Sequence, residues 1–223
     1  MYLKHLFLFL MKMDKLFNFI DYMCIKYSID ESHGLKHAKG TVVKAISILR
    51  TLPNISEEES RVTIYASALH DTCDSKYTDV TIASQEIREW LFENKWIEEE
   101  INAVIGIITT MSYSKLKASM IDGKPVYPDH GKWQRAYDVA RHADLLEAYN
   151  VARCYLYNLH IHPRQTEEEH WNAVIQLFNI RIFRYVKDGW ITLPGALQFV
   201  PVLEYKARNN IKKRLTYWPD VSL

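Results

Sequence analysis

The chain has 223 residues, of which 48% are hydrophobic, so it can bury one full core and is expected to form a single domain. Its 28 Lys and Arg residues almost balance 27 Asp and Glu residues, and a formal net charge of +1 excludes the broad positive field that gathers extended nucleic acid or an anionic membrane. Three cysteines without CxxC spacing argue against a disulfide framework and a zinc knuckle, and reduced thiols favour a cytoplasmic location.

The first segment in chain order is an apolar start that resembles a targeting sequence. Its apolar run from Leu6 to Leu10 is too short to span a bilayer, and no small-residue cleavage site follows. Met11 and Met13 are alternative start residues. We therefore predict an N-terminal extension or alternative start region over residues 1–13, and one helical domain over residues 14–223.

Apolar residues recur at helical spacing through most of the remaining chain. The predicted helices cover residues 41–52, 56–70, 81–94, 97–108, 133–157 and 171–185, and a last stretch from Pro194 or Pro201 to Leu215. The second of them begins with a capping-box signature, Ser56 followed by Glu59. No alternating pattern of useful length predicts a strand. The expected fold class is therefore all-α, a single-domain helical bundle.

One long segment lacks helical periodicity. Between Ser112 and Trp133 the string Asp122-Gly123-Lys124-Pro125 provides turn chemistry instead, and a loop of this length is often functional. A different turn is predicted at His160-Ile161-His162, because Pro163 follows it, and these histidines are expected on the surface.

Four side chains that can bind a metal lie on three of the predicted helical segments. His37 stands at the front of one, the adjacent pair His70-Asp71 at the end of the next, and Asp144 inside a third. Alone, a His-Asp dipeptide is usually a core histidine beside a surface acid. Two imidazoles and two carboxylates can, however, converge in the interior of a helical bundle, where a divalent cation compensates the buried negative charge.

The order of these motifs resembles a known family. The matching segments are SHGLKHA at 32–38, LHDTCDSKY at 69–77, MSYSK at 111–115 and ADLLEAYNVAR at 143–153. Together they resemble the HD-domain superfamily of metal-dependent phosphohydrolases, and are most similar to the small bacterial HD-domain nucleotide pyrophosphatases. The resemblance implies an HD-type helical domain in which His37, His70, Asp71 and Asp144 are the ligands of one divalent cation per chain.

The identity of the cation follows partly from the donor atoms. Mixed nitrogen and oxygen ligands suit Mn²⁺, Fe²⁺ or Co²⁺, with Mg²⁺ and Zn²⁺ also compatible. The resemblance favours Mn²⁺ or Mg²⁺. Four protein ligands leave two positions of an octahedron for a phosphate oxygen and a water molecule, which is the arrangement needed for phosphoester or phosphoanhydride hydrolysis.

Other residues of the matching segments supply the remaining catalytic parts. Asp74, which follows Asp71 by three residues, is expected one helical turn away if the helix persists, and would serve as the general base. A solvated turn acid is the alternative. Three cations and one histidine are the candidate substrate-binding residues, although each is also compatible with an ordinary structural or surface role. These residues are Lys76, Lys115, Arg153 and His33.

The expected reaction is hydrolysis of a nucleoside triphosphate to a monophosphate and pyrophosphate. Within the enzyme class, a 5′-nucleotidase acting on a monophosphate is the nearest alternative. In another class, the chain would be a non-catalytic nucleotide sensor that retains the metal site. The expected partner is a nucleotide or another small phosphorylated molecule, without extended nucleic acid or membrane, and the sequence is compatible with a homo-oligomer.

Overall fold

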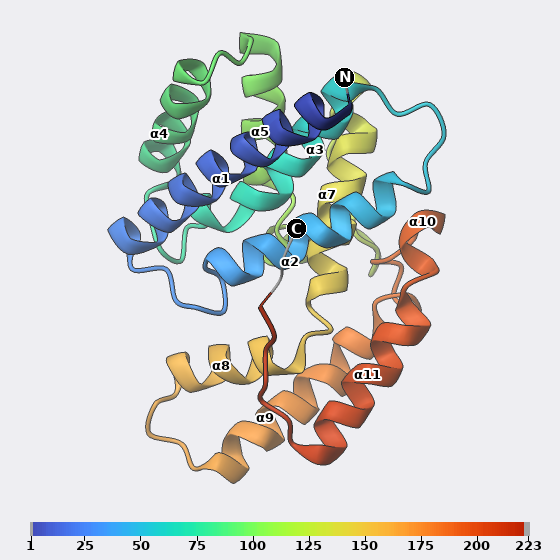
Figure 1. The fold of residues 1–223 in the computed structure, drawn as a ribbon. Helices are drawn as coiled ribbons and strands as arrows, with labels where there is room; N and C mark the ends of the chain where they lie inside the picture. Colours follow the sequence, from blue (N-terminus) through green and yellow to red (C-terminus); the bar gives the residue numbers. More distant parts are fainter. Residues whose placement is uncertain (1, 221–223) are drawn as a thin grey trace.

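The computed structural model describes residues 2–220, with side chains from Lys12 onward, and forms one all-α domain (Figure 1). Within these residues the only β feature is a single bridge between Ile121 and Lys124. The helices are α1 (Tyr2–Tyr27), α2 (Leu35–Leu49), α3 (Glu57–Leu69), α4 (Val80–Glu93), α5 (Glu98–Thr110), α6 (Tyr113–Ala118), α7 (Gln134–Glu147), α8 (Val151–Ile161), α9 (Glu167–Ile180), α10 (Pro194–Leu197) and α11 (Val200–Lys213), with short 3-10 helices η1 (His70–Cys73), η2 (Gly131–Trp133) and η3 (Ile182–Arg184).

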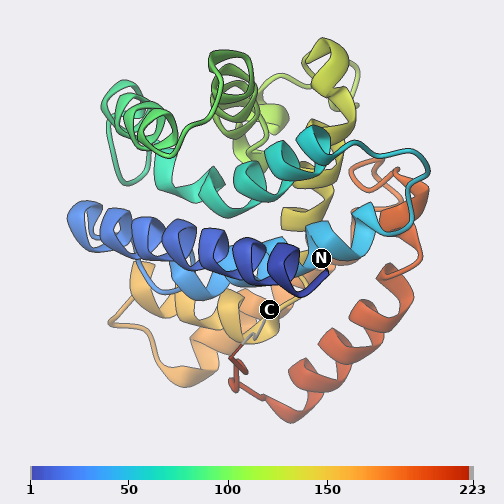
Figure 2. The same ribbon diagram turned by 45° about the horizontal axis from the view of Figure 1, so that its top comes forward.

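Helices α2, α3 and α7 pack against one another and form the centre of the domain. The helix α7 approaches its neighbours closely because Ala136, Ala140 and Ala143 are small and fully buried. On α2, Gly40 lies against Glu147, where a Cβ atom would come within 2.6 Å of the Glu147 carboxylate. Helix α1 lies along the outside of this centre, as Figure 2 shows.

A second group of helices lies beside this centre. Helices α8 and α9 form an antiparallel hairpin at the lower end of the domain in Figure 1, and α11 contacts α8. The hairpin is held by aromatic packing, since the rings of Tyr155 and Trp171 lie 4.8 Å apart and Trp171 is fully buried. Helix α8 carries Arg153, and Arg181 follows the end of α9.

Several predicted helices are confirmed, and their boundaries show what the periodicity missed. The capping box at Ser56 and Glu59 is present, and α3 follows it. Helix α2 begins at Leu35 instead of Thr41, so His37 lies in its first turn. The single helix predicted over 133–157 is wrong, because Asn150 caps a new helix by accepting a hydrogen bond from the Arg153 backbone N–H.

Two further predictions need correction. The segment 112–133, predicted as a loop, contains helix α6 and the short η2. The helix predicted over 171–185 begins earlier, at a capping box of Thr166 and Glu169, and ends before Arg181, whose backbone angles (φ −132°, ψ −67°) are not helical. His160 and His162 are exposed, as predicted, but helix α8 runs through His160 and Ile161, so the predicted turn begins only after them.

The predicted boundary at residue 13 falls inside α1, which continues through it without a break. Met13 is buried in the core. Side chains 1–11 lie outside the described part of the structure, so the extension over residues 1–13 stays a prediction. Across residues 2–220, no helix combines the length and the apolar character that a bilayer crossing requires.

A buried histidine on α7 predicts how the stability of the fold depends on pH. The His142 Nδ1 donates to the Asp138 carbonyl, and its Nε2 accepts from the backbone N–H groups of Thr192 and Leu193 at 3.0 and 3.1 Å. Burial, with a contribution from Arg141, lowers the pKa of His142 to about 3. The folded protein therefore keeps this ring neutral in mild acid, whereas the unfolded chain protonates it near pH 6.5.

Only the unfolded state gains this proton as the pH falls. The contribution of neutral His142 to the free energy of unfolding is therefore present above about pH 6.5 and is lost progressively at lower pH. Between pH 7 and pH 5 the loss through His142 is expected to be about 2 kcal/mol. Urea unfolding of wild type and His142→Gln at both pH values, in EDTA, measures it. The variant is expected to lose less stability on acidification than wild type, and an equal loss in the two proteins would contradict the prediction.

Candidate metal centre

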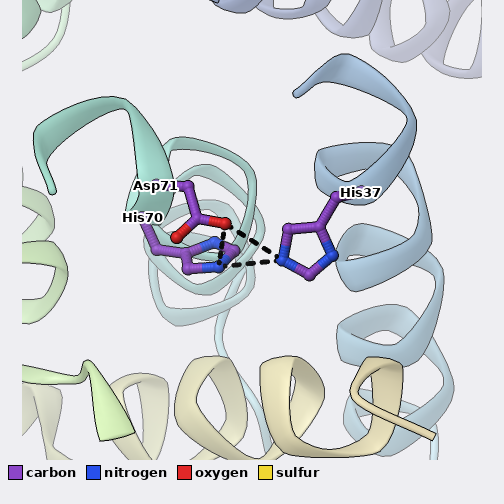
Figure 3. A group of neighbouring side chains, drawn as sticks. All are labelled: His37, His70 and Asp71. Atoms are coloured by element: carbon purple, nitrogen blue, oxygen red, sulfur yellow. Dashed lines mark hydrogen bonds and ion pairs between the residues drawn. The ribbon is translucent and has the colours of Figure 1, made fainter. Parts of the chain in front are cut away.

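Three helical segments bring the four predicted ligands together. His37 comes from the first turn of α2, His70 and Asp71 from η1 directly after α3, and Asp144 from α7. Figure 3 shows His37 facing the His70-Asp71 pair from the neighbouring helix. The close packing of α2, α3 and α7 is what makes residues so distant in sequence meet. His37, His70 and Asp71 form a buried group that can hold a metal ion.

The distances between the donor atoms suit a shared cation. The Nε2 atoms of His37 and His70 are 3.1 Å apart, and each lies 3.2 Å from Asp71 Oδ2. Asp144 Oδ1 lies 3.4 Å from the first nitrogen and 3.5 Å from the second. Donors at right angles around a cation lie about 3 Å apart when each bond is about 2.1 Å long. The four side chains are therefore spaced like neighbouring ligands.

A hydrogen bond orients the His70 imidazole toward the group. The His70 Nδ1 lies 2.8 Å from the Ser67 carbonyl and donates to it, which in the neutral ring leaves the Nε2 lone pair facing the group. Asp71 Oδ2 is buried and makes no well-formed hydrogen bond with a described residue, although both imidazole Nε2 atoms lie 3.2 Å from it. A buried carboxylate oxygen is costly unless it is well paired, and a cation between it and the two imidazoles is a partner that this donor set fits.

The charges of the group are strongly coupled. Burial opposes protonation of His70, but the carboxylates of Asp71 and Asp144 outweigh it and raise its pKa well above the ordinary value. Burial also opposes ionisation of the two acids, yet the positive charge of the protonated His70 ring holds the pKa of Asp71 and of Asp144 well below the usual range. Both acids therefore remain ionised and provide the negative charge that a divalent cation compensates.

A cavity of about 280 Å³ opens beside this group. It is lined by His70, Asp71 and Asp144. The Asp144 side chain is 19% exposed. Four of the five residues predicted to act on the substrate also line it, and these are Asp74, Lys76, Arg153 and His33. The volume lies near the lower end of the range for small-molecule sites, so it suits phosphate groups better than a whole nucleotide.

Lys115, the fifth predicted substrate residue, is not brought to this cavity. It lies on α6, and its ammonium group donates to the Thr109 carbonyl at 2.8 Å, near the end of α5. The physical reason is that α5 ends at Thr110 with carbonyl groups that have no partner within the helix, and the nearby ammonium satisfies one of them.

Asp74 lies in the cavity wall, but not through a continued helix. The 3-10 turn η1 ends at Cys73, and Asp74 has an extended backbone (φ −83°, ψ 130°). Its carboxylate accepts the backbone N–H of Lys76 at 2.9 Å and lies 3.5 Å from the Lys76 ammonium. The α-helix therefore does not persist to Asp74, but the Asp74 backbone N–H donates to the Asp71 carbonyl at 3.3 Å, so the two residues are one 3-10 turn apart and line the same cavity.

His33 is held by a network that sequence reasoning missed. Asp30 receives hydrogen bonds from Ser32 and from the Tyr77 hydroxyl, and its Oδ2 lies 3.3 Å from His33 Nδ1. The Lys76 ammonium lies 3.1 Å from His33 Nε2. Burial lowers the pKa of His33, so the neutral ring accepts from the lysine. The turn signal of an Asp two residues before a Ser could have indicated Asp30.

Arg153 connects the site to the start of α2. Its Nε donates to the Ser32 carbonyl at 2.7 Å. Burial disfavours the charged guanidinium, but Asp144 and Asp71 outweigh this and raise its pKa. The cavity also has an aromatic wall and another arginine that are not indicated as site residues by the sequence, and these are Tyr113, Tyr157, Tyr185 and Arg181. Tyr113 lies in the matching segment 111–115, whereas Tyr157, Tyr185 and Arg181 have no local sequence signal, because a tyrosine or an arginine at such positions is equally suited to packing or to the surface.

Comparisons with protein-family models, with curated proteins and with solved structures give no match for this chain. Two imidazoles and one carboxylate form a buried group that can hold a metal ion, with a second carboxylate beside them and a cavity open to them.

Proposed function

We propose that the chain is a metal-dependent phosphohydrolase of the HD-domain type that hydrolyses nucleoside triphosphates to monophosphate and pyrophosphate. The observation that carries this proposal is the convergence of His37, His70, Asp71 and Asp144 beside one cavity. Asp74 and three cationic side chains, Lys76, Arg153 and Arg181, also line this cavity. A cation site alone is also compatible with a structural role. The adjacent base and cations are what phosphoryl transfer requires.

In this proposal, each group at the site has a separate role in the reaction. When bound, a divalent cation, Mn²⁺ or Mg²⁺ in this proposal, supplies Lewis acidity to a phosphate oxygen and to the attacking water. The water oxygen forms a bond to the α-phosphorus, and the bond from that phosphorus to the bridging oxygen breaks. Asp74 accepts the proton of the water, and Lys76 and Arg153 stabilise the charge that develops on the phosphates.

The test of this function is a panel of nucleoside mono-, di- and triphosphates, assayed with Mn²⁺ and with Mg²⁺. Pyrophosphate release from triphosphates is the expected result. Orthophosphate release from monophosphates alone would reject the proposed reaction in favour of a 5′-nucleotidase. Nucleotide binding without turnover in either metal would support the sensor alternative.

The role of Asp74 gives a separate prediction. In Asp74→Asn the side chain keeps its size and can still accept the Lys76 backbone N–H, but it no longer accepts a proton. We expect kcat to fall by about 100- to 10,000-fold, because general base catalysis contributes on that order. Cation affinity, measured by calorimetry, is expected to stay within about threefold of wild type, since Asp74 is not a ligand here. An unchanged kcat would exclude Asp74 as the base.

A further inference from the structure

Arg181 is the single non-helical residue between α9 and η3. Helix α9 ends at Ile180, and the non-helical backbone of Arg181 separates it from η3. The Arg181 side chain lines the same cavity as Asp144 and Arg153. It therefore adds a positive charge to the wall of the candidate site, although its position in the sequence lies far from the matching motifs.

Two tyrosines hold the Arg181 guanidinium in place. Its Nε donates to the Tyr185 hydroxyl at 2.8 Å, and its central carbon lies 3.6 Å from the centroid of the Tyr113 ring. Tyr185 is fully buried, and the Tyr113 ring packs against Trp190 at 4.5 Å. A guanidinium stacked on one ring and bonded to another has little freedom left to lose when it binds a ligand.

The charge of Arg181 has no acidic partner among the described residues, whereas the other cations of the cavity are engaged. Lys76 pairs with Asp74, and Arg153 donates to the Ser32 carbonyl beside the two carboxylates of the centre. Arg184, three residues further on, illustrates the contrast, because both oxygens of Asp188 lie 3.0 Å from it. The terminal nitrogens of Arg181 are therefore available for an anion from outside the chain.

We propose that Arg181 binds the second phosphate group of the substrate and so selects phosphate chains over phosphate monoesters. This inference rests on the proposed function, in which the first phosphate group lies at the His37-His70-Asp71-Asp144 centre. A phosphate group beyond the first needs a donor elsewhere in the cavity, and a planar guanidinium matches two phosphate oxygens at once. Arg181 takes the role that the sequence assigned to Lys115, which the structure places outside the cavity.

The test is calorimetric titration of inorganic pyrophosphate and of orthophosphate into the Mg²⁺-loaded protein. Arg181→Gln is expected to weaken pyrophosphate binding by about 10- to 100-fold, which is the range for a lost charged hydrogen-bond pair. Orthophosphate affinity is expected to change by about threefold or less. Arg181→Lys, which keeps the charge but lacks the planar fork, is expected to fall between wild type and Arg181→Gln.

Two control variants distinguish the loss of the Arg181 contact from a general loss of structure. Arg184→Gln removes a neighbouring arginine that does not line this cavity, and it is expected to bind both anions like wild type. Tyr185→Phe removes only the hydroxyl that accepts from Arg181, so the packing is kept and a smaller loss of pyrophosphate affinity is expected. Equal weakening of pyrophosphate and orthophosphate in Arg181→Gln would overturn the proposal.

The outcomes also separate this inference from the proposed reaction. If wild type binds pyrophosphate through Arg181 but hydrolyses no triphosphate, the anion site stands and the proposed reaction falls. If Arg181→Gln binds pyrophosphate and hydrolyses triphosphate like wild type, the role of Arg181 is rejected and the phosphohydrolase proposal is unaffected.

Discussion

Asp71→Ala is expected to lose the bound cation and to reduce kcat/KM for a nucleoside triphosphate by about 1,000-fold or more. Its Oδ2 lies 3.2 Å from both imidazole Nε2 atoms, so its removal leaves one carboxylate to compensate a divalent charge. Residues that only support a ligand typically cost 10- to 100-fold, and loss of the ligand itself should cost more. Elemental analysis after dialysis gives the cation per chain, and steady-state kinetics gives kcat/KM.

The control for this prediction is Asp14→Ala, which removes an exposed carboxylate on α1. It is expected to bind the cation and turn over substrate like wild type. Circular dichroism at the working temperature verifies that both variants are folded. An Asp71→Ala protein that keeps one cation per chain and full turnover would contradict the assignment of the centre.

Removal of the cation is expected to lower the thermal stability of the wild-type protein. The folded chain presents converged donors that the unfolded chain does not, so a cation at about 100 times its Kd adds about 2.7 kcal/mol. For a chain of this length, that free energy corresponds to a Tm difference of about 5 to 10 °C. Differential scanning calorimetry in EDTA and in saturating Mn²⁺ measures the difference.

The matched pair for this experiment is His37→Gln and His162→Gln. The first removes a fully buried ligand of the centre and is expected to abolish the Tm difference. The second removes an exposed histidine at the end of α8 and is expected to retain it. A wild-type Tm that responds to none of the divalent cations compatible with these donors would show that the group does not hold a metal.

Part of this fold could be predicted because its signals are local. The capping box at Ser56 and Glu59 specifies the start of α3, and the small residues of α7 predict a closely packed helix. The break at residues 148–150 was missed, because an apolar stripe can continue across two helices when a cap such as Asn150 restarts the hydrogen-bond pattern. Arg181 was missed because the helix predicted over 171–185 runs through the position where α9 ends.

By itself, the sequence determined the all-α class, most of the helical segments and four residues able to bind a cation, since helical periodicity and donor chemistry are written in neighbouring residues. Only the tertiary structure decided which side chains share the cavity. It brought Asp30 and Arg181 to the site and held the ammonium group of Lys115, on α6, against the end of α5. These positions depend on how the helices pack. Contacts between residues more than a hundred positions apart, such as Arg153 with Ser32, have no local signal to be recognised.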